Sequence, residues 1–104
     1  MLESNKSGYI TLPTINQGAV VNEQFTITNN CKNDIDILSI TAGCGCTVPS
    51  GIVGKMLQGA SQTINFSYNS RGKHGQNINS VIIKWRDADN LIKTLSQSFK
   101  VTVL

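Results

Sequence analysis

The sequence predicts an all-β protein folded as an antiparallel β-sandwich of about seven strands. Apolar and polar residues alternate over short segments, which is the two-residue period of strands with one buried face. Clusters of Gly, Asn, Ser and Pro separate these segments at intervals of roughly 8 to 12 residues, the spacing of strands in a sandwich. No stretch keeps the 3.6-residue period of a helix. The length fits one domain over residues 1–104.

The first two predicted strands differ in how strongly they are marked. Residues 9–14 (YITLPT) alternate weakly, and Pro13 places this strand at a sheet edge because proline has no N–H for a second neighbour. Residues 21–30 (VNEQFTITNN) alternate clearly, with Phe25 and Ile27 on one face.

The third predicted strand changes phase. Residues 34–41 (DIDILSIT) direct Ile35 and Ile37 to one side, but the next large apolar residue in the core phase is Ile40. An odd number of residues from one inward-facing position of a strand to the next, as from Ile37 to Ile40, predicts a β-bulge. A short fourth strand is expected around residues 47–49.

The last three predicted strands follow a Gly-rich loop over residues 50–61 and share one pattern. Each carries three large apolar residues at alternate positions. They are residues 62–69 with Ile64, Phe66 and Tyr68, residues 77–85 with Val81, Ile83 and Trp85, and residues 96–104 with Phe99, Val101 and Val103. Trp85 is therefore expected to be buried between the sheets.

Charge and hydropathy exclude two classes of partner. The net charge is +3, and the nine Lys and Arg residues are scattered, so nucleic acid is not expected as a partner. The one basic cluster, residues 71–74, is predicted to be a solvated turn. No apolar run approaches the ~20 residues of a membrane span.

The first ten residues lack the pattern of a signal peptide, so we expect a protein used without export unless a leader has been removed.

The segment Cys44-Gly45-Cys46-Thr47 follows the third predicted strand, and after it come a small-residue turn, an aromatic strand and a second Gly-rich turn. With this pattern, residues 20–104 resemble a bacterial immunoglobulin-like family of unknown function. That family is similar in fold to the PapD, major sperm protein and ASH domains, which implies an immunoglobulin-like sandwich. This chain has Asn29-Asn30-Cys31 where members usually have Asn-x-Gly, and many members carry an export signal.

Three roles for Cys44 and Cys46 can be weighed. A disulfide between them would close a small strained ring, and redox pairs usually have Cys-x-x-Cys spacing. A metal site could use both cysteines and His74, which is expected in a turn at the same end, but three ligands are one short of a structural zinc site. Cys31 is expected at the opposite end. Packing is the favoured role, so we expect three free thiols, and no metal or cofactor.

The inventory of chemical groups also argues against an enzyme. There is one histidine and no Gly-x-Ser-x-Gly, so no catalytic triad is predicted. The favoured hypothesis is a structural assembly module that docks on a repeated structural protein, such as a capsid accessory or decoration protein of a phage virion. The alternative is a domain of an exported envelope protein that mediates protein–protein interaction, and a third hypothesis is a metal- or thiol-binding protein.

The assembly hypothesis predicts a docking surface and a location. The surface is made by the turns over residues 41–47 and 69–76, with Arg71, Lys73 and Thr47 as contact residues. The edge strand at residues 9–14 is the alternative surface. The location is the virion or the cytoplasm, or outside the cytoplasm if a leader has been removed.

Overall fold

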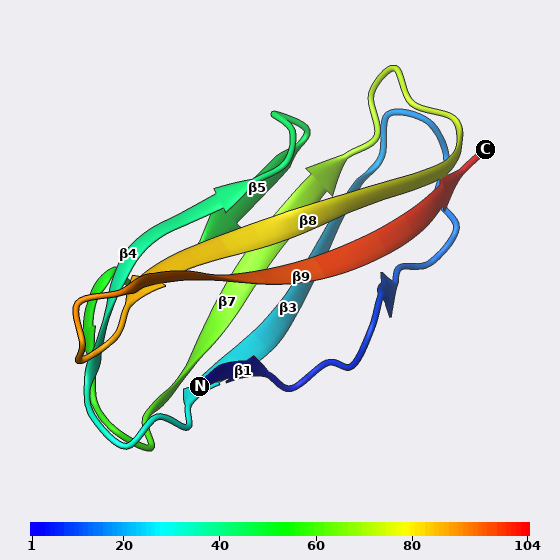
Figure 1. The fold of residues 1–104 in the computed structure, drawn as a ribbon. Coiled ribbons are helices and arrows are strands. Elements are labelled where there is room, and N and C mark those ends of the chain that lie inside the picture. Colours follow the sequence, from blue (N-terminus) through cyan, green and yellow to red (C-terminus); the bar gives the residue numbers. More distant parts are fainter.

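The computed structural model describes residues 1–104, and nine β-strands in two packed sheets make up the fold (Figure 1). No segment is helical, so no helix could cross a membrane. The strands are β1 (Leu2–Ser4), β2 (Ile10–Thr11), β3 (Val20–Asn29), β4 (Ile35–Ala42), β5 (Thr47–Ser50), β6 (Gly54–Met56), β7 (Ser61–Asn69), β8 (Gly75–Arg86) and β9 (Ile92–Val103).

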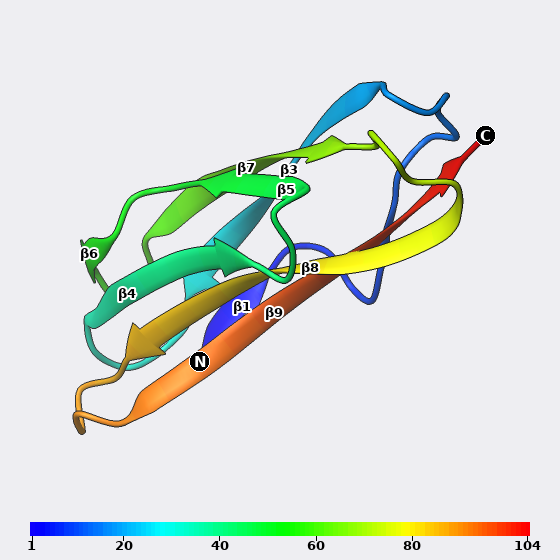
Figure 2. The same ribbon diagram turned by 90° about the horizontal axis from the view of Figure 1, so that it is seen from above.

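The two sheets form the layers of a sandwich. The four-stranded sheet has the order β1-β3-β7-β5, and the five-stranded sheet has the order β2-β9-β8-β4-β6. Figure 2 shows the layers from above, with β5 and β6 along one side of the molecule. All neighbouring strands are antiparallel except β2, which runs parallel to β9. The predicted fold class is therefore confirmed, with one parallel pair added.

The number of strands was predicted too low. The two missed strands, β1 and β6, are only three residues long, and each has one buried side chain, Leu2 or Met56. Such segments are too short to display an alternating pattern. The predicted first strand is reduced to β2, which lies at an edge as Pro13 indicated.

The predicted β-bulge in β4 is confirmed. The pairing of β4 with β8 shifts register between Ile37 and Ser39. This extra residue returns Ile40 to the side of the core, against which it packs.

The core lies between the sheets and contains seventeen buried apolar residues. Phe99 of β9 contacts β7 of the other sheet, with ring centroids 4.8 Å from Phe66 and 5.8 Å from Tyr68. Burial raises the pKa of Tyr68, so its hydroxyl stays protonated at neutral pH. Trp85 is 3% exposed, which confirms its predicted burial.

One buried polar residue, Asn29, holds the turn between β3 and β4. Its Nδ2 donates to the carbonyl oxygens of Asn33 (3.1 Å) and Met56 (3.0 Å). Its Oδ1 accepts the N–H of Cys31 at 3.0 Å. The side chain thus satisfies two backbone groups of the turn after β3 and one at the end of β6. Asn29 is the first residue of the segment that stands in place of the family's Asn-x-Gly.

Candidate functional site

The Cys-Gly-Cys-Thr segment forms the turn that carries the chain from β4 in one sheet to β5 in the other. Two backbone hydrogen bonds fix it to both sheets. Gly43 N–H donates to the Ser80 carbonyl of β8 at 3.0 Å, and Asn69 N–H of β7 donates to the Cys46 carbonyl at 2.8 Å. The turn is therefore anchored to both layers of the sandwich.

Cys44 and Cys46 form a disulfide bond, so the prediction of three free thiols was wrong. Their Cα atoms are 5.4 Å apart, within the range that a disulfide spans. The spacing argument failed because the turn folds the two residues back toward one another. Both side chains are half-buried, and Cys31, in the turn after β3, is the free cysteine.

A residue that the sequence did not single out, Asn79 of β8, organises this turn. Its Nδ2 lies 2.6 Å from Cys44 Sγ, 3.1 Å from Thr47 Oγ1 and 3.6 Å from Cys46 Sγ. Its Oδ1 accepts the N–H of Ser80 at 2.8 Å. Its position in the alternating pattern could have identified it, because Asn79 is a polar residue on the same face of β8 as the buried residues.

The two glycines of the turn, Gly43 and Gly45, have different roles. Neither has a positive φ. A Cβ on Gly43 would lie 2.5 Å from Asn79 Oδ1, whereas a Cβ on Gly45 would meet no atom within 4 Å other than those of its two chain neighbours. Gly43 is needed for space beside the Asn79 amide, and Gly45 is not.

We therefore expect Gly43→Ala to lower the free energy of unfolding by about 1–3 kcal/mol, because the Asn79 amide must move and weaken its hydrogen bonds. Gly45→Ala is the matched control, and its effect should stay within about 0.5 kcal/mol. Denaturant unfolding followed by Trp85 fluorescence measures both. Equal effects of the two substitutions would contradict the role of Asn79.

The disulfide gives a second expected result. Thiol titration of the denatured, unreduced protein should find one free thiol, that of Cys31, and titration after reduction should find three. Cys31→Ala should remove the single thiol from the unreduced sample. Three thiols before reduction would show that Cys44 and Cys46 are not paired.

The structure places the predicted contact residues in different environments. Thr47 is 4% exposed and bonded to Asn79, so it cannot serve as a surface contact, and this part of the prediction was wrong. It was misplaced because it begins β5 on the buried phase of that strand. Arg71 is exposed and Lys73 half-buried in the turn after β7. The one salt bridge of the structure joins Lys93 and Asp87, so neither Arg71 nor Lys73 is paired with a carboxylate of the chain.

The proposed metal ligands are not brought together. No group of three or more His, Cys, Asp or Glu side chains is placed to hold a metal ion. The sulfurs of Cys44 and Cys46 are bonded to one another, which removes two of the three thiolate or imidazole ligands. The third, His74, lies in an exposed turn.

A second surface feature is the β5–β6 flank, residues 47–57, which closes one side of the sandwich. It carries four apolar side chains that are each more than half exposed: Val48, Ile52, Val53 and Leu57. It contains one charged residue, Lys55. Exposed apolar residues gathered on an edge strand and the adjoining loops are typical of a protein-binding surface.

The β5–β6 flank is held firmly despite its exposure. The Gln62 side chain binds both backbone groups of Ile52: Oε1 accepts its N–H at 2.9 Å, and Nε2 donates to its carbonyl at 3.0 Å. A Cβ on Gly51 would lie 2.6 Å from Ile64 Cδ1 and 2.7 Å from Ile40 Cδ1. The backbone is thus packed on the core while the apolar side chains point outward.

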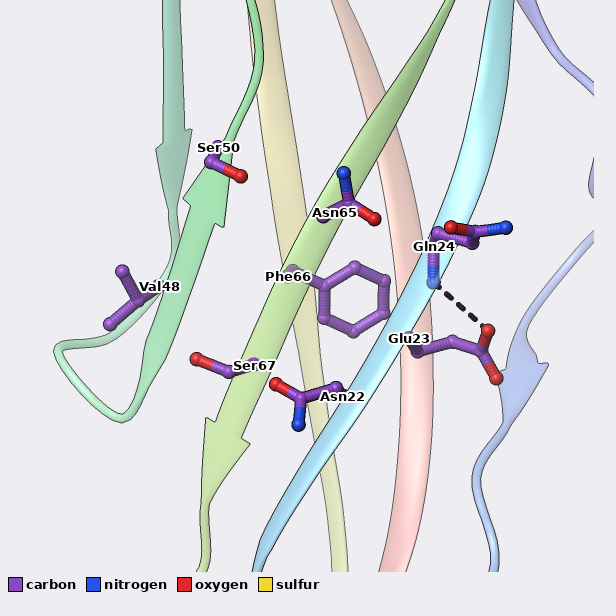
Figure 3. A pocket seen from close by; sticks show the side chains of 8 residues that line it. All are labelled: Asn22, Glu23, Gln24, Val48, Ser50, Asn65, Phe66 and Ser67. Carbon is purple, nitrogen blue, oxygen red and sulfur yellow. Dashed lines mark hydrogen bonds between the residues drawn. The ribbon is translucent and has the colours of Figure 1, made fainter.

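A shallow groove of about 610 Å³ lies beside the β5–β6 flank, over the outer face of β3, β7 and β5 (Figure 3). Five of its eight lining residues carry an amide or a hydroxyl, and Val48 lies at its margin. Glu23 is the one carboxylate, and it accepts the N–H of Gln24 at 2.9 Å. Val48 and Ser50 belong to both the flank and the groove, and the two features together contain two charged residues, Lys55 and Glu23.

Fold and turn together define the class: an immunoglobulin-like sandwich of the PapD and ASH type, with a disulfide-closed turn between β4 and β5. The chain belongs to the family described as proteins of unknown function, DUF1573, whose model matches residues 3–101. The predicted resemblance is confirmed. No curated protein sequence is similar enough to count as a match.

Solved structures with the same fold share little sequence with the chain. An ASH/PapD-like domain of human CEP192 is 13% identical with a TM-score of 0.79, and the match covers 99% of this chain and 84% of that one. The periplasmic chaperone SfaE is 13% identical with a TM-score of 0.66, and the match covers 99% of this chain and 57% of the chaperone. The secreted serine protease VesC from Vibrio cholerae is 19% identical with a TM-score of 0.67, and the match covers 99% of this chain and 23% of the protease.

Proposed function

We propose that the chain is a non-enzymatic protein-binding domain that works in an oxidising compartment outside the cytoplasm and binds its partner through the β5–β6 flank. The observation that carries the proposal is the flank itself. Ile52 and Val53 are exposed on a loop whose backbone is fixed by Gln62, so binding a partner needs little ordering of the chain. Burial of such residues gives about 25 cal/mol per Å² of apolar surface.

The partner that fits this surface is a protein with an apolar, weakly charged contact face. The β5–β6 flank carries one charged side chain, Lys55, so it offers little electrostatic attraction to a charged ligand. The outer edges of β5 and β6 have no neighbouring strand, so a strand of the partner can also pair with their backbone groups. Likeness to PapD-like and ASH domains supports a binding role without catalysis, since these structures match most of the present fold.

The proposed location is supported by the disulfide. Disulfides persist in oxidising compartments and are rare in the bacterial cytoplasm. Likeness in fold to a periplasmic chaperone and to a secreted protease supports the same location. Neither the fold nor the comparisons support the virion hypothesis or a repeated structural partner, and both stay predictions from the sequence.

The test is partner capture with three matched variants of the full chain. Ile52→Glu combined with Val53→Glu alters the β5–β6 flank. Ile78→Glu is the control, since Ile78 of β8 is 58% exposed, close to the 57% of Val53. We expect the wild-type chain and the Ile78→Glu control to be cross-linked to the same partner from the native source, and the flank variant to lose it. The melting temperatures of both variants should equal that of the wild type. Retention of the same partner by the flank variant would overturn the proposed surface.

The turn bearing Arg71 and Lys73 is the second candidate surface, because both cations lack an acidic partner within the chain. Arg71→Glu combined with Lys73→Glu reverses the charge of this turn. Loss of the partner in this variant alone would show that the turn, rather than the flank, is the docking surface. It would also indicate an acidic partner, whose binding should weaken with salt.

A further inference from the structure

We infer that the Cys44–Cys46 disulfide is a thiol-exchange site: it accepts a thiol of a partner molecule on Cys44 and can oxidise a partner dithiol to a disulfide. The inference goes beyond protein binding and does not depend on the β5–β6 flank. It rests on an asymmetry between the two sulfurs. Cys44 Sγ is contacted by two N–H donors, and Cys46 Sγ is packed toward the core.

The donors around Cys44 favour a thiolate. Asn79 Nδ2 lies 2.6 Å from Cys44 Sγ, and the Cys46 N–H lies 3.3 Å from the same atom. Hydrogen bonds to the charged form of a thiol stabilise that form and lower its pKa. Cys46 Sγ has two contacts, both longer: 3.6 Å from the same Asn79 amide and 4.0 Å from Thr47 Oγ1. After reduction, the negative charge is therefore held better on Cys44 than on Cys46.

Access favours the same sulfur. Cys46 contacts the hydrophobic core, whereas Cys44 is half-buried without being part of that packing. Gly45 adds no side chain, and apart from residues 44–46 themselves there is no heavy atom within 4 Å of the place where its Cβ would lie. An incoming thiol can therefore approach the turn from the side of Gly45 and Cys44 more easily than from the core.

The exchange can be written with its electrons balanced. A partner thiolate attacks Cys44 Sγ; the Cys44–Cys46 bond breaks, and its electron pair goes to Cys46 Sγ, which takes a proton from water. A second thiolate of the partner then attacks the partner sulfur joined to Cys44. That bond breaks and leaves its electron pair on Cys44 Sγ, where the two N–H groups hold the thiolate. The partner loses two electrons and becomes a disulfide, and Cys44 and Cys46 gain them.

Asn79 is a positioning residue in this scheme. Its amide donor stabilises Cys44 as the leaving group in the second step, and stabilisation of the reduced form makes a disulfide a stronger oxidant. Thr47 Oγ1 and the Ser80 N–H hold the same amide in place. The Cys-Gly-Cys-Thr turn and Asn79 therefore act as one unit.

The first measurement compares the two thiols in a Cys31→Ala background. Cys46→Ser leaves Cys44 as the only thiol, and Cys44→Ser leaves Cys46. The rate of alkylation by iodoacetamide is recorded against pH for each, with Trp85 fluorescence as the check on folding. We expect the midpoint for Cys44 to lie on the order of one pH unit below that for Cys46. Equal midpoints, or a lower midpoint for Cys46, would overturn the inference.

The second measurement tests Asn79 with a matched control. Asn79→Asp keeps the acceptor for Ser80 but removes the donor to Cys44, so the midpoint of the Cys44 thiol should rise. Asn77→Asp introduces the same charge two residues away, where the native amide bonds only to the carbonyls of His74 and Gly75. A similar rise in both variants would attribute the effect to charge alone and would overturn the role of Asn79.

The third measurement uses glutathione as the probe with the Cys31→Ala chain. At intermediate ratios of reduced to oxidised glutathione, mass spectrometry should find a mixed disulfide, and peptide mapping should place it on Cys44. A mixed disulfide on Cys46 would contradict the scheme. A pair that stays oxidised at every ratio while the protein remains folded would show a purely structural disulfide.

Discussion

Replacement of Asn29 by aspartate should lower the free energy of unfolding by on the order of 3 to 5 kcal/mol at pH 7. The side chain is fully buried, and its Nδ2 donates to two carbonyl oxygens, those of Asn33 and Met56. A carboxylate has no proton to donate, so both carbonyls lose their partner and face a negative charge. Denaturant unfolding of the full chain measures the loss.

The loss from Asn29→Asp should depend on pH in a defined direction. Burial and the two carbonyl oxygens raise the pKa of the introduced carboxyl in the folded state above its unfolded value of about 3.9. Below the unfolded value the carboxyl is protonated in both states, and the electrostatic part of the penalty is absent. The penalty grows as the pH rises through the unfolded value and is complete above the folded value. A penalty independent of pH would contradict this account.

The neighbouring residue provides the matched control. The Asn30 amide is exposed and donates to Glu3 Oε2 at 2.9 Å. Asn30→Asp makes the same chemical change one residue away and should cost less than about 1 kcal/mol, because both groups remain in water. A comparable loss from both substitutions would show that the turn after β3 is not organised by Asn29.

Removal of the Phe99 ring should also destabilise the protein by about 3–5 kcal/mol. Phe99 is fully buried on β9 and contacts Phe66 and Tyr68 of β7, so its ring joins the two sheets across the core. Phe99→Ala removes this contact and leaves a cavity that the sheets can close only in part. Calorimetry and denaturant unfolding should agree on the size of the loss.

An exposed aromatic residue is the control for Phe99. Tyr9, before β2, is 54% exposed, and Tyr9→Ala should change the free energy of unfolding by less than about 0.5 kcal/mol. Phe99→Leu, which keeps much of the volume, should cost less than Phe99→Ala. A loss below about 1 kcal/mol for Phe99→Ala would mean that the sheets do not pack through this ring.

Prediction from the sequence was most accurate where a segment was long enough to show its period. The alternation in β3, β7, β8 and β9 identified the buried faces, including those of Phe25, Ile64 and Trp85. It also located the bulge in β4 from the displaced position of Ile40. Each of these features depends on which side of a strand a residue occupies, and the order of residues fixes that side.

Only the tertiary structure decided the contacts between strands that are distant in the sequence. Asn79 is in phase with the buried residues of β8, but its position in the sequence could not show that its amide meets Cys44, 35 residues earlier. The distance between Cys44 and Cys46 likewise depends on how the turn bends between β4 and β5. The sequence thus determined the long strands, their buried faces and the family resemblance. The packing of the two sheets decided the pairing of the cysteines, the burial of Thr47 and the exposure of the β5–β6 flank. These features depend on loop conformation and on contacts between sheets, which leave no repeating pattern in the sequence.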